Sequence, residues 1–310
     1  MNVLFVSSGN SKYGIVPFIK CQGESLKKEG VELDYFTIKG KGIKGYLGNI
    51  KQLRRTIKKN QYEIIHAHYG FAGLFCLLSF NGIPIVLSVM GSDVYGSYNS
   101  EGKRIKSSYI EMFLTQITLL FVSRIIVKSK NILKMVLQRK KTQIIPNGVY
   151  FEKFKPNSND LAKDRILFLA NPNDPRKNFK LVKKAVELID KKGLKLINPY
   201  PVCHNQVPDF LNSSSVFVLT SYNEGSPNVI KEAMACNIPI VSTDVGDVRE
   251  LIKKTEGCYI SGFKPEDVAE KIEKALDYGK RTTGRDDMGR LESSVVARRI
   301  IDVYKKVLET

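Results

Sequence analysis

Short runs of β-branched and aromatic residues alternate along this chain with segments whose apolar positions follow the period of a helix. Two of these runs, Asn2–Ser7 and Arg165–Ala170, open the two halves of the chain, and each leads into a polar loop and a helical pattern. Short buried strands that alternate with helices are typical of parallel sheets with right-handed crossovers. The other expected strands are Glu32–Ile38, Ile64–His66, Ile85–Val89, Arg124–Lys128, Thr142–Ile145, Lys195–Asn198, Val216–Thr220, Pro239–Ser242 and Gly257–Ile260. The expected helices include Ile50–Lys59, Lys130–Leu137, Lys180–Lys191, Asn228–Ala235, Pro265–Tyr278 and Leu291–Leu308. The pattern predicts two doubly wound α/β units.

The boundary between the two units is expected within Pro146–Asp160. Residues 146–148 (PNG) form a turn, and residues 156–160 are polar, rich in breakers and without periodicity. A chain of 310 residues is comfortable for two domains of about 150 residues each. Ligands of open parallel sheets bind at the carboxyl ends of the strands, so we expect the site in the cleft between the two units.

The segment Phe71–Met90 is long and apolar enough to suggest a membrane-spanning helix. Residues 81–84 (NGIP) interrupt it with turn chemistry, so a buried helix over Ala72–Phe80, a turn and a buried strand is the better interpretation. The amino-terminal residues run directly into the apolar Val3–Val6 without a secretory signal. We therefore expect a soluble protein.

The net charge of +18 is unevenly distributed along the chain. Residues 1–150 contain 22 basic and 8 acidic side chains, a net of +14, whereas residues 151–310 contain 27 and 23, a net of +4. A basic half suggests an anionic partner, which could be a membrane surface, a nucleic acid or a phosphorylated substrate. The alternative is that the charge only keeps the protein soluble.

Neither a disulfide framework nor a metal site is expected. The five cysteines are scattered without a CxxC pair, which favours reduced thiols in a cytosol; they are Cys21, Cys76, Cys203, Cys236 and Cys258. The HAH sequence after a strand could place His68 at the carboxyl edge of the sheet, facing the cleft, although a hydrogen-bonded loop histidine is equally acceptable. The third histidine is distant in sequence and no suitable carboxylate cluster accompanies the pair, so we predict no metal and no cofactor.

The window 221–250 (SYNEGSPNVIKEAMACNIPIVSTDVGDVRE) contains the most informative pattern. Ser226 is a good N-cap and Pro227 suits the first helical position, so a helix is expected to begin here. The amides of its first residues, together with the helix dipole, would form an anion site suited to phosphate. Glu224 and Glu232 flank this start and could accept hydrogen bonds from the hydroxyls of a sugar nucleotide. An ordinary capped helix with solvated glutamates remains the alternative.

Two further groups could contact a charged ligand. Arg176 and Lys177 follow the first strand of the second half, and together they could neutralise a diphosphate leaving group without a metal. The loop 7–14 (SSGNSKYG) follows the first strand of the chain, and its glycines would let the backbone approach phosphates or an acceptor. This loop is not GxGxxG, so dinucleotide binding is not supported, and a plain turn is the alternative.

These motifs resemble those of a known enzyme family. Glu224 and Glu232 match the E-x7-E signature of retaining glycosyltransferases of GT-B architecture, family 4 (glycosyl transferases group 1), and the surrounding window is similar to that family almost throughout. Supporting matches are IPNGVYFEKF at 145–154, HAHYG at 66–70, GSDVYG at 91–96 and PRKN at 175–178. The resemblance covers most of the chain and is weakest over residues 10–60.

The resemblance implies two facing Rossmann-like, doubly wound parallel-sheet domains. Residues 1–155 would bind the acceptor, residues 156–290 the nucleotide sugar, and the amphipathic helix in 291–310 would cross back to the first domain. It also implies catalytic roles for Glu224 at the donor sugar and for Lys177 and Arg176, and a ribose contact for Glu232. The implied donor-binding residues are Gly225, Ser226, Pro227, Asn228, Val229 and Glu232, and those at the acceptor side or in the cleft are Gly9, Tyr13, Gly14, His68 and Asp93.

The chain departs from the family pattern at two positions. Met90 stands where the family often has a histidine, just before the GSD motif that contains Asp93. Asn171 stands where the family usually has the first of two spaced cations, and here Arg176 and Lys177 are adjacent. Lys177 is therefore the preferred partner of the diphosphate, followed by Arg176.

We predict a metal-independent retaining glycosyltransferase that moves a hexosyl unit from a nucleotide diphosphate sugar to a hydroxyl of a cell-envelope polysaccharide or lipid-linked acceptor. Two alternatives stay open: a catalytically silent subunit of this fold, and a nucleic-acid-binding protein, although no RRM, KH or zinc-knuckle signature is present. An anionic membrane surface is the expected partner, nucleic acid is not, and the expected location is cytoplasmic, peripheral at the inner face of the cell membrane. The basic side chains of one helix would dock there; they are Lys51, Arg54, Arg55, Lys58 and Lys59, with Lys103, Arg104 and Lys106 expected nearby.

Overall fold

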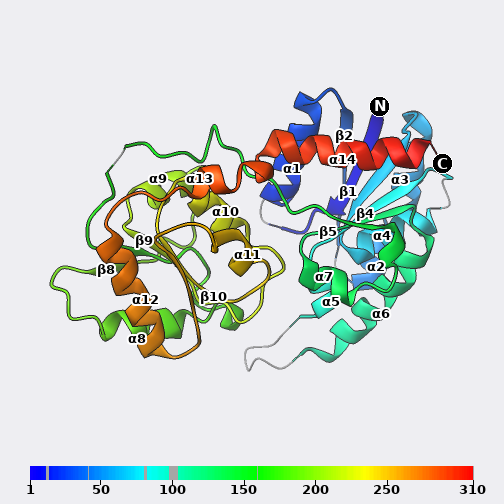
Figure 1. Cartoon of the computed structure of the whole chain (residues 1–310). Coiled ribbons are helices and arrows are strands. Elements are labelled where there is room, and N and C mark those ends of the chain that lie inside the picture. The colour runs from blue at the N-terminus through cyan, green and yellow to red at the C-terminus, as the bar shows by residue number, and fades with distance from the viewer. Residues whose placement is uncertain (12–13, 41, 80–81, 98–103, 159, 310) are drawn as a thin grey trace. The chain divides into compact units, whose positions relative to one another are not determined.

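The computed structural model describes residues 1–11, 14–40, 42–79, 82–97, 104–158 and 160–309. These residues form two compact units, each built on its own parallel sheet (Figure 1). Unit 1 comprises residues 1–97, 104–148 and 293–309, and unit 2 comprises residues 149–292. The predicted fold class, two doubly wound α/β units, is confirmed.

Unit 1 has a six-stranded sheet in the order β2-β1-β3-β4-β5-β6, with every neighbouring pair parallel. Its strands are β1 (Asn2–Ser8), β2 (Glu32–Ile38), β3 (Ile64–His68), β4 (Ile85–Val89), β5 (Arg124–Val127) and β6 (Thr142–Ile144). Its helices are α1 (Pro17–Lys28), α2 (Gly42–Leu47), α3 (Ile50–Lys59), α4 (Gly70–Leu78), α5 (Ser92–Tyr95), α6 (Lys106–Phe121), α7 (Lys130–Met135), the 3-10 turn η1 (Arg139–Lys141) and α14 (Ser293–Leu308). Within the described residues, no helix is both long and apolar enough to span a bilayer.

Unit 2 has a five-stranded parallel sheet in the order β11-β10-β9-β7-β8. Its strands are β7 (Arg165–Leu167), β8 (Lys195–Ile197), β9 (Val216–Leu219), β10 (Ile240–Thr243) and β11 (Cys258–Ser261). Its helices are α8 (Phe179–Glu187), α9 (Val207–Asn212), α10 (Asn228–Ala235), α11 (Val248–Ile252), α12 (Pro265–Tyr278), α13 (Gly284–Asp287) and the 3-10 turns η2 (Pro175–Lys177) and η3 (Gly289–Leu291).

The strand order reverses once in each sheet. In unit 1 the chain moves from β1 to β2 and then returns past β1 to β3, and in unit 2 it moves from β7 to β8 and then returns past β7 to β9. Because right-handed crossovers in opposite directions place helices on opposite faces, the loops after the two central strands diverge at this point. The crevice left there, at the carboxyl ends of the strands, is where open α/β sheets bind ligands.

The apolar core of each unit follows from the pattern of its strands. In unit 1, one face of the sheet packs against α3, α4, α6 and α7 through buried residues that include Leu53, Phe75, Leu119 and Ile132. In unit 2 a second cluster joins the sheet to α8 and α12 through residues such as Val182 and Ile272. The apolar positions that recur with helical periodicity in these segments are therefore the ones that are buried in the core.

The boundary between the units lies at Gly148, earlier than the residue 155 expected from the sequence. Residues 149–155 belong with unit 2 because the Arg285 guanidinium donates to the carbonyl oxygens of Phe151 (3.0 Å) and Phe154 (2.6 Å) and lies 4.2 Å from the centroid of the Phe151 ring. A single arginine thus holds the first turn of this segment to α13, an interaction that no local sequence pattern signals.

Helix α14 is carboxy-terminal in the sequence but packs on α1 of unit 1 (Figure 1). Tyr304 is fully buried, and its hydroxyl lies 2.5 Å from Nδ1 of His66, whose Nε2 lies 2.8 Å from Oγ of Ser88. Burial and the nearby Lys128 ammonium hold the pKa of His66 well below its usual range, so the ring is neutral. Strands β3 and β4 are therefore joined to α14 by one hydrogen-bonded chain.

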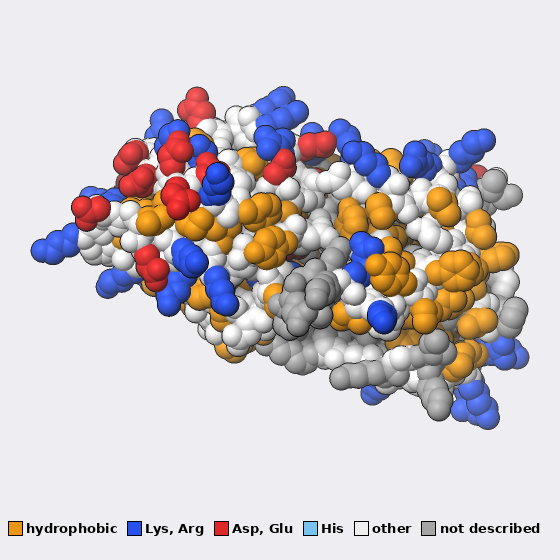
Figure 2. Space-filling view, turned by 90° about the horizontal axis from the view of Figure 1, so that it is seen from below, with side chains coloured by type: hydrophobic (Ala, Val, Ile, Leu, Met, Phe, Trp, Pro, Cys, Tyr) orange, Lys and Arg blue, Asp and Glu red, His pale blue; other side chains and the backbone are white. Residues whose placement is uncertain are grey.

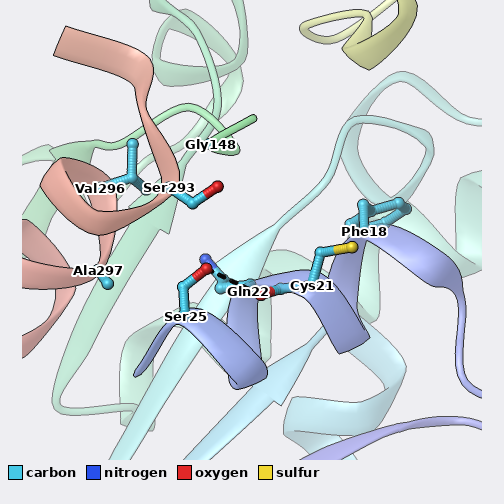
Figure 3. Close-up of a pocket in the computed structure, with 8 residues that line it drawn as sticks. All are labelled: Phe18, Cys21, Gln22, Ser25, Gly148, Ser293, Val296 and Ala297. Atoms are coloured by element: carbon cyan, nitrogen blue, oxygen red, sulfur yellow. Dashed lines mark hydrogen bonds between the residues drawn. The ribbon is translucent and has the colours of Figure 1, made fainter. Parts of the chain in front are cut away.

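Close packing of α14 on α1 leaves one small cavity (Figure 3). Gln22 and Ser25 of α1 line it together with Ser293 and Val296 of α14, and its volume is about 10 Å³. Both polar atoms of the Gln22 amide and the hydroxyl oxygen of Ser293 are buried there, and none of the three has a hydrogen-bond partner among the residues that the structure describes. A polar cavity of this size suits one water molecule.

Replacing Tyr304 with Phe removes the hydroxyl and leaves Nδ1 of His66 unpaired in a fully buried site. We expect the free energy of unfolding to fall by about 1–3 kcal/mol, the usual cost of stranding a buried polar group. Urea unfolding followed by circular dichroism measures the loss. The control is Tyr200→Phe on the exposed surface of unit 2, which should change stability by less than about 0.5 kcal/mol. Equal losses in the two variants would contradict this account.

Candidate functional site

The point of strand reversal in unit 2 brings two loops together. One follows β7 and contains η2, and the other follows β9 and contains residues 220–227. They are joined directly, because the Tyr222 amide donates to the carbonyl oxygen of Arg176 at 2.9 Å. The buried Thr220 hydroxyl lies 3.1 Å from the Lys177 carbonyl oxygen, so the start of the second loop is also tied to η2. These contacts hold the predicted cation and carboxylate positions side by side.

The Lys177 ammonium and the Glu224 carboxylate form the central ion pair of this site. Nζ of Lys177 lies 2.5 Å from Oε1 of Glu224, and the same oxygen accepts a hydrogen bond of 2.9 Å from the Ser221 hydroxyl. The side chains are 27% and 18% exposed, so both are partly shielded but can be reached from solvent. The pairing brings together two residues that are 47 positions apart in the sequence.

Arg176 is held differently from its neighbour. Its guanidinium binds the carboxylate of Asp174 through two bonds, Nε to Oδ1 at 3.1 Å and Nη2 to Oδ2 at 2.8 Å. The hydrogen bond to Asp174 raises the pKa of Arg176. Burial raises the pKa of Asp174, but the hydrogen bonds from Arg176 outweigh this effect, so the net shift of that pKa is downward. Lys177 is therefore the cation that contacts Glu224, whereas Arg176 is paired with the Asp174 carboxylate of its own loop.

The start of α10 differs from the predicted cap. The helix covers Asn228–Ala235 as expected, but its N-cap is Pro227, and the Ser226 hydroxyl donates to Oδ2 of Asp247 at 2.7 Å instead of capping the helix. The prediction of Ser226 as N-cap was therefore wrong, because a tertiary acceptor competes for its hydroxyl. The first amides of α10 lack partners within the helix, as at every helix start, and lie directly after the Glu224 loop.

A glycine lets the loop after β10 approach this segment. Gly246 has a φ of +61°, and a Cβ atom there would lie 2.8 Å from the carbonyl oxygen of Gly225. Any larger residue would therefore clash with the backbone and strain its own conformation. This close approach is what brings Asp247 within reach of Ser226.

Glu232 belongs to a second polar cluster on the same helix. Its Oε1 lies 2.8 Å from Nε2 of His204, and Nδ1 of that ring lies 3.1 Å from Nζ of Lys153. Both contacts are satisfied when the ring proton is on Nε2, because Lys153 then donates to Nδ1 and the imidazole donates to Glu232. The Glu232 side chain is only 12% exposed, so this chain of contacts fixes its direction.

Lys231 is buried beside these groups. Its side chain is 1% exposed, and burial lowers its pKa to about 8, although the charges of Asp247 and Glu232 act in the opposite direction. Burial also raises the pKa of Asp247, while Lys231 and the Ser226 hydroxyl lower it. The buried Lys231 of α10 and the half-buried Asp247 therefore interact electrostatically beside Glu232. His204, Lys231 and Asp247 were all missed in the sequence, and only long-range contact identifies them.

The unit 1 positions expected at the acceptor side have mostly packing roles in the structure. A Cβ atom on Gly9 would lie 2.8 Å from Cβ of Thr37, so glycine permits the close contact of β1 with β2. Gly14 has a φ of +68° and its amide donates to the Ser11 carbonyl oxygen at 2.9 Å, which is turn geometry. Tyr13 lies outside the described residues.

His68 and Asp93 are both fully buried. His68 is the last residue of β3, stacks on His66 with centroids 4.5 Å apart, and has no hydrogen-bond partner at either ring nitrogen among the described residues. It is therefore neither a loop residue nor exposed, and burial holds its pKa well below the usual range. Asp93 accepts from the amides of Met90, Gly91 and Gly70, which organises the ends of β3 and β4.

Comparison with known proteins gives the class of this fold and site. The chain matches the family model described as glycosyltransferase family 4 over residues 22–153 and the one described as glycosyl transferases group 1 over residues 197–278. Together the two matches cover more than half of the chain, in the order of its two units. The chain belongs to the group 1 glycosyltransferases of GT-B architecture.

Three similar proteins illustrate this relationship. The UDP-Gal:alpha-D-GlcNAc-diphosphoundecaprenol alpha-1,3-galactosyltransferase of Escherichia coli is 25% identical over 65% of this chain and 62% of its own length. The phosphatidylinositol N-acetylglucosaminyltransferase GPI3 subunit of Saccharomyces cerevisiae (strain YJM789) is 22% identical over 83% of this chain and 66% of its own. The chain thus spans less than two thirds of these relatives. The structure of sucrose-phosphate synthase from Thermosynechococcus elongatus superposes with a TM-score of 0.79 at 16% identity, covering 99% of both chains.

The buried Lys231 predicts a specific dependence of stability on pH. Between its folded pKa of about 8 and the ordinary 10.5, the unfolded chain keeps a proton that the folded chain has released. Unfolding then takes up a proton, so stability rises with pH in this window, by about 3 kcal/mol at most. Below pH 8 both states carry the proton and this contribution is constant.

Lys231→Met removes the titrating group. We expect the free energy of unfolding to rise between about pH 8 and 10 more steeply in the wild type than in Lys231→Met, measured by urea titration at each pH. The slope is the readout, because loss of the cation next to Asp247 lowers the absolute stability of the variant. Parallel curves for the two proteins would show that Lys231 has an ordinary pKa.

Proposed function

We propose that this protein is a retaining glycosyltransferase that moves a hexosyl unit from a nucleotide diphosphate sugar to a hydroxyl of a lipid-linked or cell-envelope polysaccharide acceptor. The observation that carries the proposal is the Lys177–Glu224–Ser221 cluster, which lies immediately before the start of α10 at the strand reversal of unit 2. The family of the chain and the names of its relatives, which specify sugar transfer to lipid-linked acceptors, support it.

In this proposal the donor lies across the carboxyl ends of β7 and β9. The diphosphate would take its hydrogen bonds from the backbone at residues 225–229, and Lys177 would exchange part of its contact with Glu224 for a phosphate oxygen. Glu224 would then bind hydroxyls of the sugar, and Glu232, held by His204, would accept from the ribose hydroxyls. Arg176 would add long-range positive charge while it stays paired with Asp174.

The proposed chemistry is a front-face displacement. The bond between the anomeric carbon and the diphosphate oxygen breaks, the acceptor oxygen bonds to the same face of that carbon, and the acceptor proton passes to the departing diphosphate. Negative charge grows on the diphosphate as the bond breaks, and Lys177 with the helix start stabilises that charge. No metal is needed in this scheme, because cationic and backbone groups take the place of a metal clamp.

A lipid-linked acceptor lies at a membrane, so the protein must bind the membrane surface to reach it. Helix α3 presents a basic surface suited to this contact. Leu53 and Ile57 of this helix are buried, and Lys51, Arg55, Lys58 and Lys59 lie on its solvent-facing side. Arg54 differs from the prediction, since it also donates to the carbonyl oxygens of Leu78 and Ser79 and so ties α3 to the end of α4. We propose a cytoplasmic protein bound peripherally to anionic lipid at the inner face of the membrane.

Substitution of Glu232 and substitution of Glu224 should affect different quantities, nucleotide affinity in the first case and turnover in the second. Glu232→Ala removes a charged acceptor from the ribose, so it should weaken binding of the free nucleotide by about 1.5–3 kcal/mol. Glu224→Ala should leave nucleotide affinity nearly unchanged and reduce turnover, because its partner is the sugar. A thermal-shift screen with UDP, GDP and ADP selects the nucleotide, calorimetry measures its affinity, and hydrolysis of the corresponding nucleotide sugar measures turnover.

Glu250→Ala serves as the matched control, since this glutamate is exposed on α11 in the same unit. It should change neither quantity. Equal loss of nucleotide affinity in the Glu224 and Glu232 variants would refute the assigned roles. A chain that binds nucleotide but hydrolyses no nucleotide sugar, with or without acceptor, would instead support a catalytically silent subunit.

Turnover should persist in excess EDTA. The sequence contains no DxD motif, and the nearest pair of aspartates, Asp286 and Asp287, belongs to α13 and not to the site. We expect the rate of nucleotide-sugar hydrolysis in excess chelator to equal the rate without it. Loss of activity in EDTA that manganese alone restores would overturn metal independence.

A further inference from the structure

The outward face of α6 is apolar. Tyr109, Ile110, Phe113, Leu120 and Phe121 are 53%, 59%, 65%, 52% and 69% exposed, and their spacing of three and four residues places them along one side of the helix. A helix on the surface of a globular protein normally presents polar residues on this side and hydrophobic ones to the core. On α6 the buried positions instead include Ser108, Thr115 and Thr118. The usual distribution is therefore partly inverted.

The segment after α7 extends this surface. The Gln116 amide of α6 donates to the Met135 carbonyl oxygen at 2.7 Å, and its oxygen accepts from the Leu137 amide at 3.3 Å. Leu137, which is 75% exposed, is thereby held beside α6. We call the exposed residues Tyr109, Ile110, Phe113, Leu120, Phe121 and Leu137 the α6 face. Figure 2 shows hydrophobic side chains gathered on this side of unit 1, with lysine and arginine side chains along the margin.

Positive charge surrounds the α6 face. Residues 104–150 contain nine lysines and arginines and a single acidic residue, Glu111. Lys134, Arg139, Lys140 and Lys141 lie in the segment that carries Leu137, and the Lys141 ammonium donates to the Leu120 and Val122 carbonyl oxygens at the end of α6. Burial and the nearby Asp93 raise the pKa of Glu111.

The apolar surface also continues inward from α6. Leu114, next to Phe113, lines a cavity of about 240 Å³ together with residues of α2 and α4. Its other lining residues include Tyr46, Leu47, Phe71, Leu74 and Leu78, all apolar or aromatic. Apolar surface therefore spans more than one helix, which exceeds the scattered hydrophobic residues normal on a soluble protein.

We infer that the α6 face inserts into the boundary between headgroups and acyl chains of an anionic bilayer. Aromatic and aliphatic side chains on one side of a helix, bordered by lysine and arginine, are what a helix lying in this boundary requires. The basic border selects a bilayer with anionic headgroups over an uncharged apolar partner, because each cation near such a surface adds attraction. The inference builds on the membrane partner proposed above, and adds apolar insertion to the electrostatic contact of α3.

The chain has no tryptophan, so one introduced indole reports its own environment. Phe113→Trp places the indole in the α6 face, and Leu188→Trp places it, as the control, at a 54% exposed apolar position of unit 2. With vesicles of phosphatidylglycerol and phosphatidylcholine, the emission of the Phe113→Trp variant should shift to shorter wavelength, and brominated acyl chains should quench it. The Leu188→Trp variant should show neither effect. Unchanged emission of the Phe113→Trp variant in the presence of bound vesicles would overturn the inference.

Two sets of substitutions separate insertion from electrostatic docking. Phe113→Ser, Phe121→Ser and Leu137→Ser together should weaken vesicle binding at least about 100-fold at low and high salt, since each exposed side chain contributes roughly tenfold. Lys51, Arg55, Lys58 and Lys59 changed to Gln should remove mainly the salt-sensitive part. None of these side chains is buried, so the melting temperature should stay close to that of the wild type.

The remaining outcomes are also decisive. Wild-type vesicle binding by the triple Ser variant would overturn the inference, whatever the α3 variant does. Sedimentation equilibrium tests a second copy as the occupant: a wild-type dimer that Phe113→Ser converts to a monomer would make the α6 face a subunit interface. Hydrolysis of nucleotide sugar in solution is independent of α6, so its absence together with bilayer insertion of the Phe113→Trp variant would refute the proposed function alone.

Discussion

The arrangement of the candidate site in unit 2 depends on one topological constraint, the reversal of strand order around β7. Because β8 and β9 lie on opposite sides of β7, the loops that follow β7 and β9 emerge at neighbouring strand ends while their helices diverge. The Lys177–Glu224 contact, the Tyr222–Arg176 backbone bond and the approach of Gly246 to Gly225 all depend on this geometry. In a sheet with sequential strand order, β8 would lie between β7 and β9 and separate these loops.

Charged residues have opposite uses in the two units. In unit 2 the pairs Lys177–Glu224 and His204–Glu232 remain partly accessible, and the charge of the buried Lys231 interacts with the charges of Asp247 and Glu232. In unit 1 the polar groups at the strand ends form hydrogen bonds within the unit. Asp93 binds three backbone amides, and His66 binds Tyr304 and Ser88. The positive charge of unit 1 lies instead on its surface, beside the exposed side chains of α6. Unit 2 thus gathers accessible ion pairs at the ends of its strands, whereas unit 1 uses the polar groups at its strand ends in internal hydrogen bonds.

Much of this could be predicted because it is local. The alternation of buried strands and helices indicated the two α/β units, and the window around Glu224 and Glu232 indicated the start of helix α10. An error arose where a tertiary partner outcompeted a local one, because Asp247 takes the hydroxyl of Ser226. The apolar face of α6 could not be predicted, because a run such as FLTQITLLF looks like a core helix until its burial is known.

The sequence alone determined the strands, the class of fold and the family of the chain, because these follow from periodicity and from motifs contained within a few dozen residues. The sequence could not determine which polar groups are buried inside the fold and which remain available to a ligand. His68 and Asp93 have the same residue types as catalytic groups, but burial removes both from water. His204, 28 positions before Glu232, meets it only when the sheet is assembled. Tertiary structure decided these roles because burial and hydrogen bonding depend on every neighbour in space, whereas sequence patterns report only neighbours along the chain.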